Sequence, residues 1–146
     1  MTKRAILFSI KPPYVSLIES GLKRFELRRQ RPNISTGDLA LVYESSPTKS
    51  LVGAFFVGEI LSEEPNVLWE IVGHESGITK DDFLDYFEGC EVGCSIQIKQ
   101  YWSLAERICI NEMRTKHKIR PPQSYRFLNK AETSNLMGKF KNNLSA

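Results

Sequence analysis

The chain has 146 residues, of which 41% are hydrophobic and 25% are charged, with a formal net charge of +3. This length predicts one domain with a core of its own, and this composition excludes a disordered protein. The longest apolar runs fall far below the roughly 18 residues of a membrane span, so we expect no transmembrane segment.

The first third of the chain is predicted to fold as a strand, a short helix and two further strands. Residues 5–10 are an apolar run of strand length, and the proline pair that follows Lys11 favours a helix start. Helical spacing of apolar residues predicts that this helix ends at Gly21. Residues 23–29 alternate between apolar and charged side chains, as a half-buried strand does, and a third strand is expected over residues 39–44.

The rest of the chain is predicted to add a long strand, several helices and a tail. The long strand covers residues 51–61, where Gly53 and Gly58 indicate bulges or bends that let a sheet curl. The remaining elements follow from periodicity and from the positions of proline and glycine. They are helices over 66–74 and 79–88, a strand over 95–102, one or two helical turns over 110–116, a strand over 125–128 and a helical or frayed tail over 129–146.

Short strands with glycine bends, few helices and no internal repeat predict the α+β class. The expected architecture is a small, partly closed β-barrel of about five to six mixed strands with short helices around it. No linker composition divides the chain, so residues 1–146 are expected to form a single domain.

The N-terminus and the cysteines both favour a cytoplasmic protein. The first apolar run is shorter than that of a signal peptide and no small-residue cleavage site follows it. The three cysteines show neither a disulfide framework nor a zinc-ligand spacing, which fits a reducing compartment. Cys109 lies between two isoleucines and is expected to be a core residue.

The net charge conceals three blocks of opposite sign. Residues 1–37 hold eight Lys or Arg and two acids, residues 38–98 hold two and twelve, and residues 99–146 hold ten and three. If the first and last blocks meet in space, they form a basic face that attracts polyanions. The alternative is an ordinary solvated surface.

Three segments carry residue types suited to a nucleic-acid ligand. The loop from Tyr43 to Lys49 combines an aromatic ring, hydroxyls and an ammonium group, although a turn with a solvated lysine has the same composition. Five cations between residues 23 and 31 could contact a polyanion or simply protect an exposed strand edge. The prolines of residues 121–126 could position Ser124 and Arg126 for a ligand or merely connect to the last strand.

The ordered set of motifs resembles the ASCH domain of the PUA-like superfamily. The similarity is close from residue 5 to about residue 61 and returns in a C-terminal element. The matching segments are 6–12 (ILFSIKP), 18–29 (IESGLKRFELRR), Gly37-Asp38, 43–49 (YESSPTK), Val52-Gly53 and 121–128 (PPQSYRFL).

This resemblance implies a PUA-like β-barrel with a basic cleft for RNA. Some ASCH proteins resemble ribonucleases that act on single-stranded RNA with Mg²⁺ or Mn²⁺, and a tyrosine, a lysine and a serine line their cleft. The matching positions, expected to be catalytic, are Tyr43, Lys49 and Ser124. The residues expected to bind the RNA backbone are Lys11, Lys23, Arg24, Arg28 and Arg126. The metal ligands and the oligomeric state are not predicted.

Two other functions stay open. Small ASCH proteins that deacetylate N4-acetylcytidine use a lysine, a threonine and a glutamate, and the corresponding positions here are Lys23, Glu26 and Glu75. A carboxylate at position 26 cannot replace a hydroxyl nucleophile, which counts against the amidohydrolase. A non-catalytic RNA reader or a transcription-linked regulator would need the same cations as a nuclease.

Overall fold

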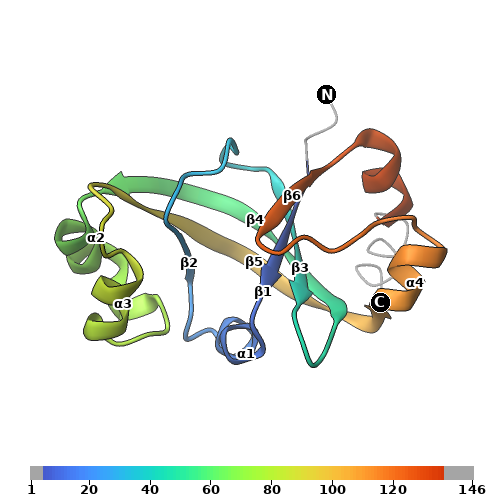
Figure 1. The fold of residues 1–146 in the computed structure, drawn as a ribbon, viewed down its shortest axis with the longest axis horizontal. Helices are drawn as coiled ribbons and strands as arrows, with labels where there is room; N and C mark the ends of the chain where they lie inside the picture. The colour runs from blue at the N-terminus through green and yellow to red at the C-terminus, as the bar shows by residue number, and fades with distance from the viewer. Residues whose placement is uncertain (1–4, 137–146) are drawn as a thin grey trace.

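The computed structural model describes residues 5–136, and its centre is one six-stranded sheet (Figure 1). The strand order is β2-β5-β4-β3-β1-β6; β1 and β3 are parallel and the other neighbours are antiparallel. The strands are β1 (Ala5–Ile10), β2 (Phe25–Arg28), β3 (Leu39–Glu44), β4 (Ser50–Glu63), β5 (Gly93–Cys109) and β6 (Tyr125–Leu128). The helices are α1 (Pro12–Glu19), α2 (Pro65–Val72), α3 (Lys80–Tyr86) and α4 (Ile110–Thr115), with a 3-10 turn at Gly73–Glu75.

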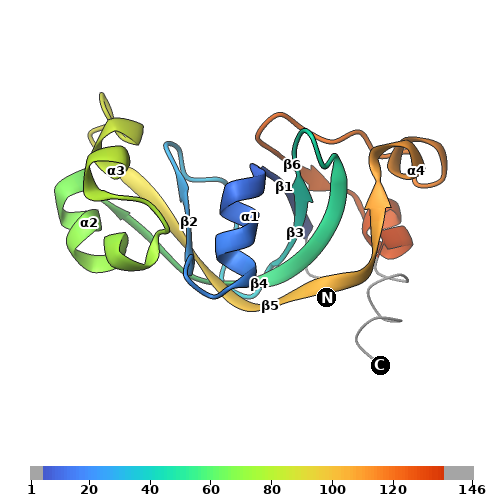
Figure 2. The ribbon, with the colours of Figure 1, turned by 90° about the horizontal axis from the view of Figure 1, so that it is seen from below.

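The two longest strands, β4 and β5, curl the sheet into a half-barrel. Their register shifts three times, between Leu51 and Gly53, between Ala54 and Phe56, and between Val57 and Ile60. Each shift is a bulge that increases the local twist and bends the pair. Figure 2 shows the resulting arc, with α1 lying in its hollow.

Helix α1 fills the hollow because one of its sides is apolar. The proline pair occupies its first turn, where backbone N–H groups have no partner within the helix, so prolines cost no hydrogen bond there. Val15 and Ile18 are buried. They pack in a cluster with residues of the sheet, among them Phe8 and Phe55, whose rings are stacked. The chain then reverses at Gly21, whose φ of 82° favours glycine, and enters β2.

Helices α2 and α3 cover the end of the sheet that carries β2 (Figures 1 and 2). Their aromatic cluster includes Trp69, Phe83 and Phe87, and Leu27 of β2 packs against it. Thr79 caps α3 by accepting a hydrogen bond from the Asp82 N–H. The cluster fixes β2 at the edge of the half-barrel.

A second core lies on the other face of the central strands, beneath α4. Leu7, Leu41 and Tyr43 point into it from β1 and β3, and Met113 of α4 and Ile119 of the following connector close it. Residues 130–136 are helical and place Leu136 in the same core. This part of the predicted tail is therefore a helix, and residues 137–146 lie outside the described residues.

The predicted α+β class and mixed β-sheet are confirmed, and two predictions were wrong. The strand expected to end at Trp102 continues to Cys109, pairing with the start of β4. The left-handed φ of 54° at Gln100 interrupts its alternation, which hid the second half of the strand. Cys109 is exposed rather than buried, because its neighbour Ile108 points into the core.

No helix within residues 5–136 is long and apolar enough to cross a membrane.

Candidate functional site

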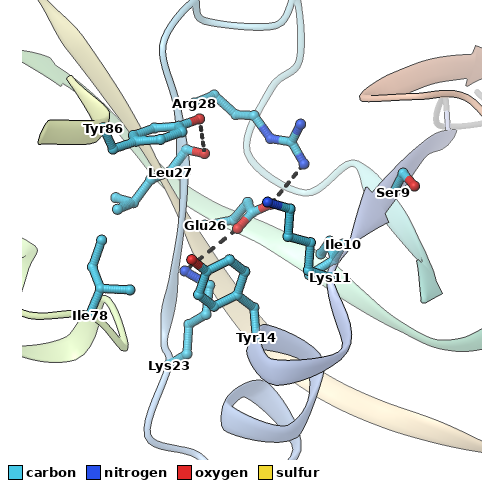
Figure 3. Close-up of a pocket in the computed structure, with 10 residues that line it drawn as sticks. All are labelled: Ser9, Ile10, Lys11, Tyr14, Lys23, Glu26, Leu27, Arg28, Ile78 and Tyr86. Carbon is cyan, nitrogen blue, oxygen red and sulfur yellow. Dashed lines mark hydrogen bonds and ion pairs between the residues drawn. The ribbon is translucent and has the colours of Figure 1, made fainter. Parts of the chain in front are cut away.

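A pocket of about 200 Å³ opens between β2, the start of α1 and the edge of α3 (Figure 3). Apolar side chains such as Leu27 and Ile78 form part of its wall, and charged and phenolic groups form the rest. The polar residues that line it are Lys11, Tyr14, Lys23, Glu26, Arg28 and Tyr86. The pocket therefore combines an apolar wall with a few convergent polar groups, which is typical of a ligand site.

Lys23 is almost fully buried at the base of this pocket, with 4% of its surface exposed. Its Nζ donates hydrogen bonds to Phe25 O at 2.8 Å and Ser76 O at 2.9 Å. Glu26 Oε1 lies 3.6 Å from Nζ. Burial lowers the pKa of Lys23 below its usual 10.5, and the Glu26 carboxylate only partly opposes this shift. The ammonium is thus held by the protein and does not face solvent.

Arg28 connects this buried pair to the C-terminal part of the chain. Its guanidinium donates to Glu26 Oε2 at 2.7 Å and to Ser124 Oγ at 2.7 Å, and it lies over the Phe8 ring at 4.7 Å. The side chains of Glu26 and Arg28 are 9% and 12% exposed. Lys23, Glu26, Arg28 and Ser124 therefore form one polar network that ends at a serine hydroxyl on the protein surface.

The C-terminal end of β1 brings two predicted catalytic residues together. Ser9 pairs in register with Tyr43 on β3, and its backbone N–H donates to Ser124 O at 2.8 Å on the other side. Neighbouring strands lie about 4.8 Å apart, so the backbones of Tyr43 and Ser124 are separated by about 10 Å. Residues 81 positions apart in the sequence thus flank a single residue of β1.

Lys49 approaches the same end of β1 through its loop. The loop begins at Ser45, whose N–H donates to Ile10 O at 2.9 Å, and Lys49 O accepts a hydrogen bond from Ile110 N at the start of α4. Lys49 has a left-handed φ of 49° and its side chain is exposed. The loop is therefore fixed at both ends while the lysine is accessible.

Tyr43 itself is buried, with 4% of its surface exposed, and its ring packs in the core beneath α4. Burial raises the pKa of its hydroxyl, and the nearby Arg114 lowers it by a smaller amount. Neither Tyr43 nor Lys49 lines the pocket that contains Lys23. A buried ring leaves no face on which a base could stack.

The predicted backbone-binding cations are spread over several environments. Lys11 is exposed at the mouth of the pocket. Arg24 is exposed and lies 3.7 Å from Glu75, and Arg126 donates to both carboxylate oxygens of Glu132 at 2.7 and 2.9 Å. Within the cationic run of residues 23–31, Lys23 and Arg28 line the pocket, whereas Arg24 pairs with Glu75 outside its lining.

The residues expected for an amidohydrolase are only partly brought together. Lys23 and Glu26 lie side by side in the pocket, whereas Glu75 pairs with Arg24 outside its lining. Tyr14 and Tyr86 line the pocket although no sequence signal distinguished them. Tyr14 lies in the first turn of α1, and Tyr86 approaches β2 through a hydrogen bond from its hydroxyl to Leu27 O at 3.1 Å.

Within residues 5–136 no group of three or more His, Cys, Asp or Glu side chains gathers as a metal site would require. The pocket carboxylate, Glu26, is already paired with Lys23 and Arg28. The described residues therefore offer no cluster of three such ligands for a divalent metal.

The curled six-stranded half-barrel with a polar pocket at its β2 edge defines a small α+β domain of the PUA-like kind. The profile of the ASCH domain matches residues 8–114. The chain therefore belongs to the ASCH domain family, as its motifs predicted.

Known relatives agree with this assignment along nearly the whole chain. An ASCH domain-containing ribonuclease of Zymomonas mobilis is 27% identical over 136 residues, which cover 92% of this chain and 91% of that protein. The crystal structure of ASCH from Zymomonas mobilis matches with a TM-score of 0.84 and 27% identity over 92% of this chain and 94% of that one.

Structures of two variants of the Zymomonas mobilis protein are also similar, with a TM-score of 0.85 and 26% identity in each case. Both matches cover 93% of this chain, and they cover 98% and 96% of the variant chains. In one variant a tyrosine is replaced by phenylalanine, and in the other a serine is replaced by alanine.

Proposed function

We propose that this protein binds single-stranded RNA and cleaves its phosphodiester backbone at the C-terminal end of β1. The observation that carries the proposal is that Ser9 has Tyr43 on one side and Ser124 on the other. The accessible Lys49 lies on the loop anchored to the neighbouring Ile10. The ribonuclease name of the Zymomonas mobilis relative supports the same activity.

Ser124 orients the phosphate in this proposal. Its oxygen already accepts a hydrogen bond from Arg28, so its hydroxyl hydrogen is free to donate to a phosphate oxygen. Arg28 is itself held by Glu26, which fixes the serine without using its proton. A donor held in place before the substrate arrives is what stabilises developing negative charge most effectively.

Lys49 and Tyr43 supply charge and a proton. The exposed ammonium of Lys49 neutralises the charge that builds on the phosphate as a hydroxyl oxygen, from water or from the ribose 2′-position, attacks phosphorus and releases its proton to solvent. The bond from phosphorus to the leaving ribose oxygen breaks, and that oxygen takes up a proton. Tyr43 contributes its hydroxyl rather than its buried ring. This hydroxyl is protonated at neutral pH, as a tyrosine ordinarily is, and burial raises its pKa further. It can therefore donate a hydrogen bond or its proton to the leaving oxygen.

The expected Mg²⁺ or Mn²⁺ stays a prediction. The described residues contain no cluster of three His, Cys, Asp or Glu side chains that would hold it, and no step of the proposed mechanism passes through a metal. The charge of the phosphate is instead met by Lys49, Arg28 and Ser124.

The test is cleavage of a labelled single-stranded RNA by the full chain, with Mg²⁺, with Mn²⁺ and with EDTA. We expect Lys49→Ala and Ser124→Ala each to slow cleavage by about 100-fold, the typical effect of removing one transition-state contact. Lys99→Ala, which removes an exposed lysine on β5, should cleave as the parent does. Unchanged rates in the first two variants would refute the proposal, and the EDTA arm shows whether a metal takes part.

A second candidate function rests on the pocket alone. Lys23, the lysine expected for an N4-acetylcytidine amidohydrolase, lies in a pocket with apolar and phenolic walls, although its neighbour Glu26 takes the place of the hydroxyl nucleophile. This function would be supported if the parent protein releases acetate from acetylcytidine and the Lys23→Met variant does not. If the parent releases no acetate and cleaves no RNA but binds RNA in a salt-sensitive way, the chain is a reader.

A further inference from the structure

A second, basic cavity lies at the α4 end of the molecule. It has a volume of about 520 Å³ and is lined by Arg114 of α4 and by Lys118 and Arg120 of the connector to β6. These three residues contribute three positive charges and no carboxylate. None of them lines the pocket that contains Lys23, so this is a separate site.

The backbone holds the three cations toward solvent. Arg114 directly follows Met113, and Lys118 and Arg120 flank Ile119; both apolar side chains are fully buried. The Ile119 N–H donates to Met113 O at 2.9 Å, which ties the connector to the helix. Because the buried residues point into the core, the neighbouring charged side chains are directed outward and all three are exposed.

Nearby cations pair with carboxylates, whereas among the described residues these three form no ion pair. Lys116 lies 3.7 Å from Glu112, and Arg126 forms a 2.7 Å ion pair with Glu132. None of the ion pairs found across residues 5–136 includes Arg114, Lys118 or Arg120. Three like charges around one cavity favour an anion with several charges.

The cavity is close to the proposed cleavage site. Arg120 is four residues before Ser124, so their Cα atoms are at most about 14 Å apart. Arg114 is near enough to Tyr43 to affect the pKa of its hydroxyl. Figure 1 shows the connector running from α4 back toward β1 and β6. A few nucleotides of an extended strand can span this distance.

We propose that Arg114, Lys118 and Arg120 bind backbone phosphates of the same single-stranded RNA, a few nucleotides to one side of the phosphate held at the end of β1. This inference rests on the proposed function and adds a second contact to it. Contacts between exposed cations and backbone phosphates do not depend on base identity, so the site contributes affinity and not sequence preference. It also makes affinity depend on RNA length, because a very short RNA cannot reach both contacts.

The test compares the affinity of labelled oligouridylates of 2 to 12 nucleotides for the full chain in EDTA over a range of NaCl concentrations. The variant is Arg114→Gln/Lys118→Gln/Arg120→Gln. The matched control, Lys80→Gln/Lys99→Gln/Arg107→Gln, removes three exposed positive charges from α3 and β5. Circular dichroism of each protein verifies folding, and Arg120→Gln alone serves if the triple variant does not fold.

We expect the cavity variant to lose at least about tenfold in affinity for the longest RNA and little for the dinucleotide. The slope of log affinity against log salt should fall in magnitude by about 2, since each phosphate contact on a single strand contributes about 0.7. Arg120→Gln alone should reduce it by about 0.7. The control should change either quantity much less.

Two other outcomes overturn the inference in distinguishable ways. If the cavity variant binds every length as the control does, the cavity does not hold RNA, while loss of cleavage in Ser124→Ala would still support the proposed function. If the parent neither binds nor cleaves RNA, the proposed function fails and the inference fails with it.

Discussion

At the scale of single residues, the most unusual feature is a cluster of charged side chains at the base of a pocket. Lys23, Glu26 and Arg28 are each nearly buried, and taking charges out of water is costly unless every group finds a partner. Two backbone carbonyls and Ser124 complete the set. We interpret the cluster as the support that positions Ser124 and not as a source of net stability.

Lys23 should make stability depend on pH. Its pKa in the folded protein lies below the usual 10.5 because of burial, so between these two values the unfolded chain binds more protons and stability rises with pH. The parent should therefore gain stability relative to Lys23→Met as the pH increases from neutral toward 10. Urea unfolding of both proteins at several pH values measures this difference. A difference that is constant or shrinks would show that the ammonium is not destabilised by burial.

Removing Arg28 should leave Glu26 only partly paired. We expect Arg28→Ala to lower the free energy of unfolding by about 2 kcal/mol, because a buried carboxylate loses its shorter ion pair. The double variant Glu26→Gln/Arg28→Ala should recover part of this loss, since it removes the charge as well. Denaturant unfolding of the three proteins provides the comparison. No recovery in the double variant would mean that packing over Phe8 is the main contribution of Arg28.

At the scale of elements, the site depends on how two long strands bend. The bulges of β4 and β5 bend the sheet so that β2 and β3 lie on opposite sides of α1 (Figure 2). The pocket beside β2 and the C-terminal end of β1 are therefore parts of one curled sheet. Gly53 lies at one of these bulges, where the backbone of β5 approaches closely. A Cβ at this position would overlap the Tyr101 hydroxyl and lie 2.7 Å from Trp102 O.

Gly53→Ala should therefore destabilise the fold. We expect a loss of about 2 kcal/mol, because the Trp102 carbonyl belongs to the sheet backbone and cannot move aside as a flexible side chain would. Ser62→Ala, at an exposed position of the same strand, should change stability by less than about 0.5 kcal/mol. Thermal or urea unfolding measures both. Equal stability of the two variants would mean that the bulge tolerates a side chain.

Local sequence signals predicted most of the elements because most of them have regular periodicity and clear ends. β1, β3 and β6 have the predicted bounds, and α3 lies within the helix predicted over residues 79–88. The second half of β5 was missed because the bulge at Gln100 reverses which side chains face the core, and periodicity cannot detect such a change.

At the scale of the whole molecule, the two basic blocks of the sequence adjoin each other and the acidic block lies mostly at the opposite end. The first and last blocks meet where β1 pairs with β6 and where Arg28 contacts Ser124. Much of the acidic middle block lies in α2, α3 and their loops, at the opposite end from α4 (Figure 1). An elongated polyanion is thus attracted to the end formed by β1, β6 and α4.

The sequence predicted which residues form the candidate site but not how the fold brings them together. Tyr43, Lys49 and Ser124 were found through motifs, yet their approach to β1 depends on pairings between residues far apart in the sequence. The burial of Lys23 and of the Tyr43 ring could not be predicted either, since side chains of both kinds are usually partly exposed.

We propose that Tyr43 and Ser124 act together on one phosphate at the end of β1. The most direct measurement is the single-turnover rate of RNA cleavage by the parent, Tyr43→Phe, Ser124→Ala and the double variant. Each single variant should cleave at least about tenfold more slowly, and the double variant should be close to the slower single one, because groups that act as a unit are not additive. Single variants that cleave like the parent, or a double variant whose loss is the product of the two, would contradict the account.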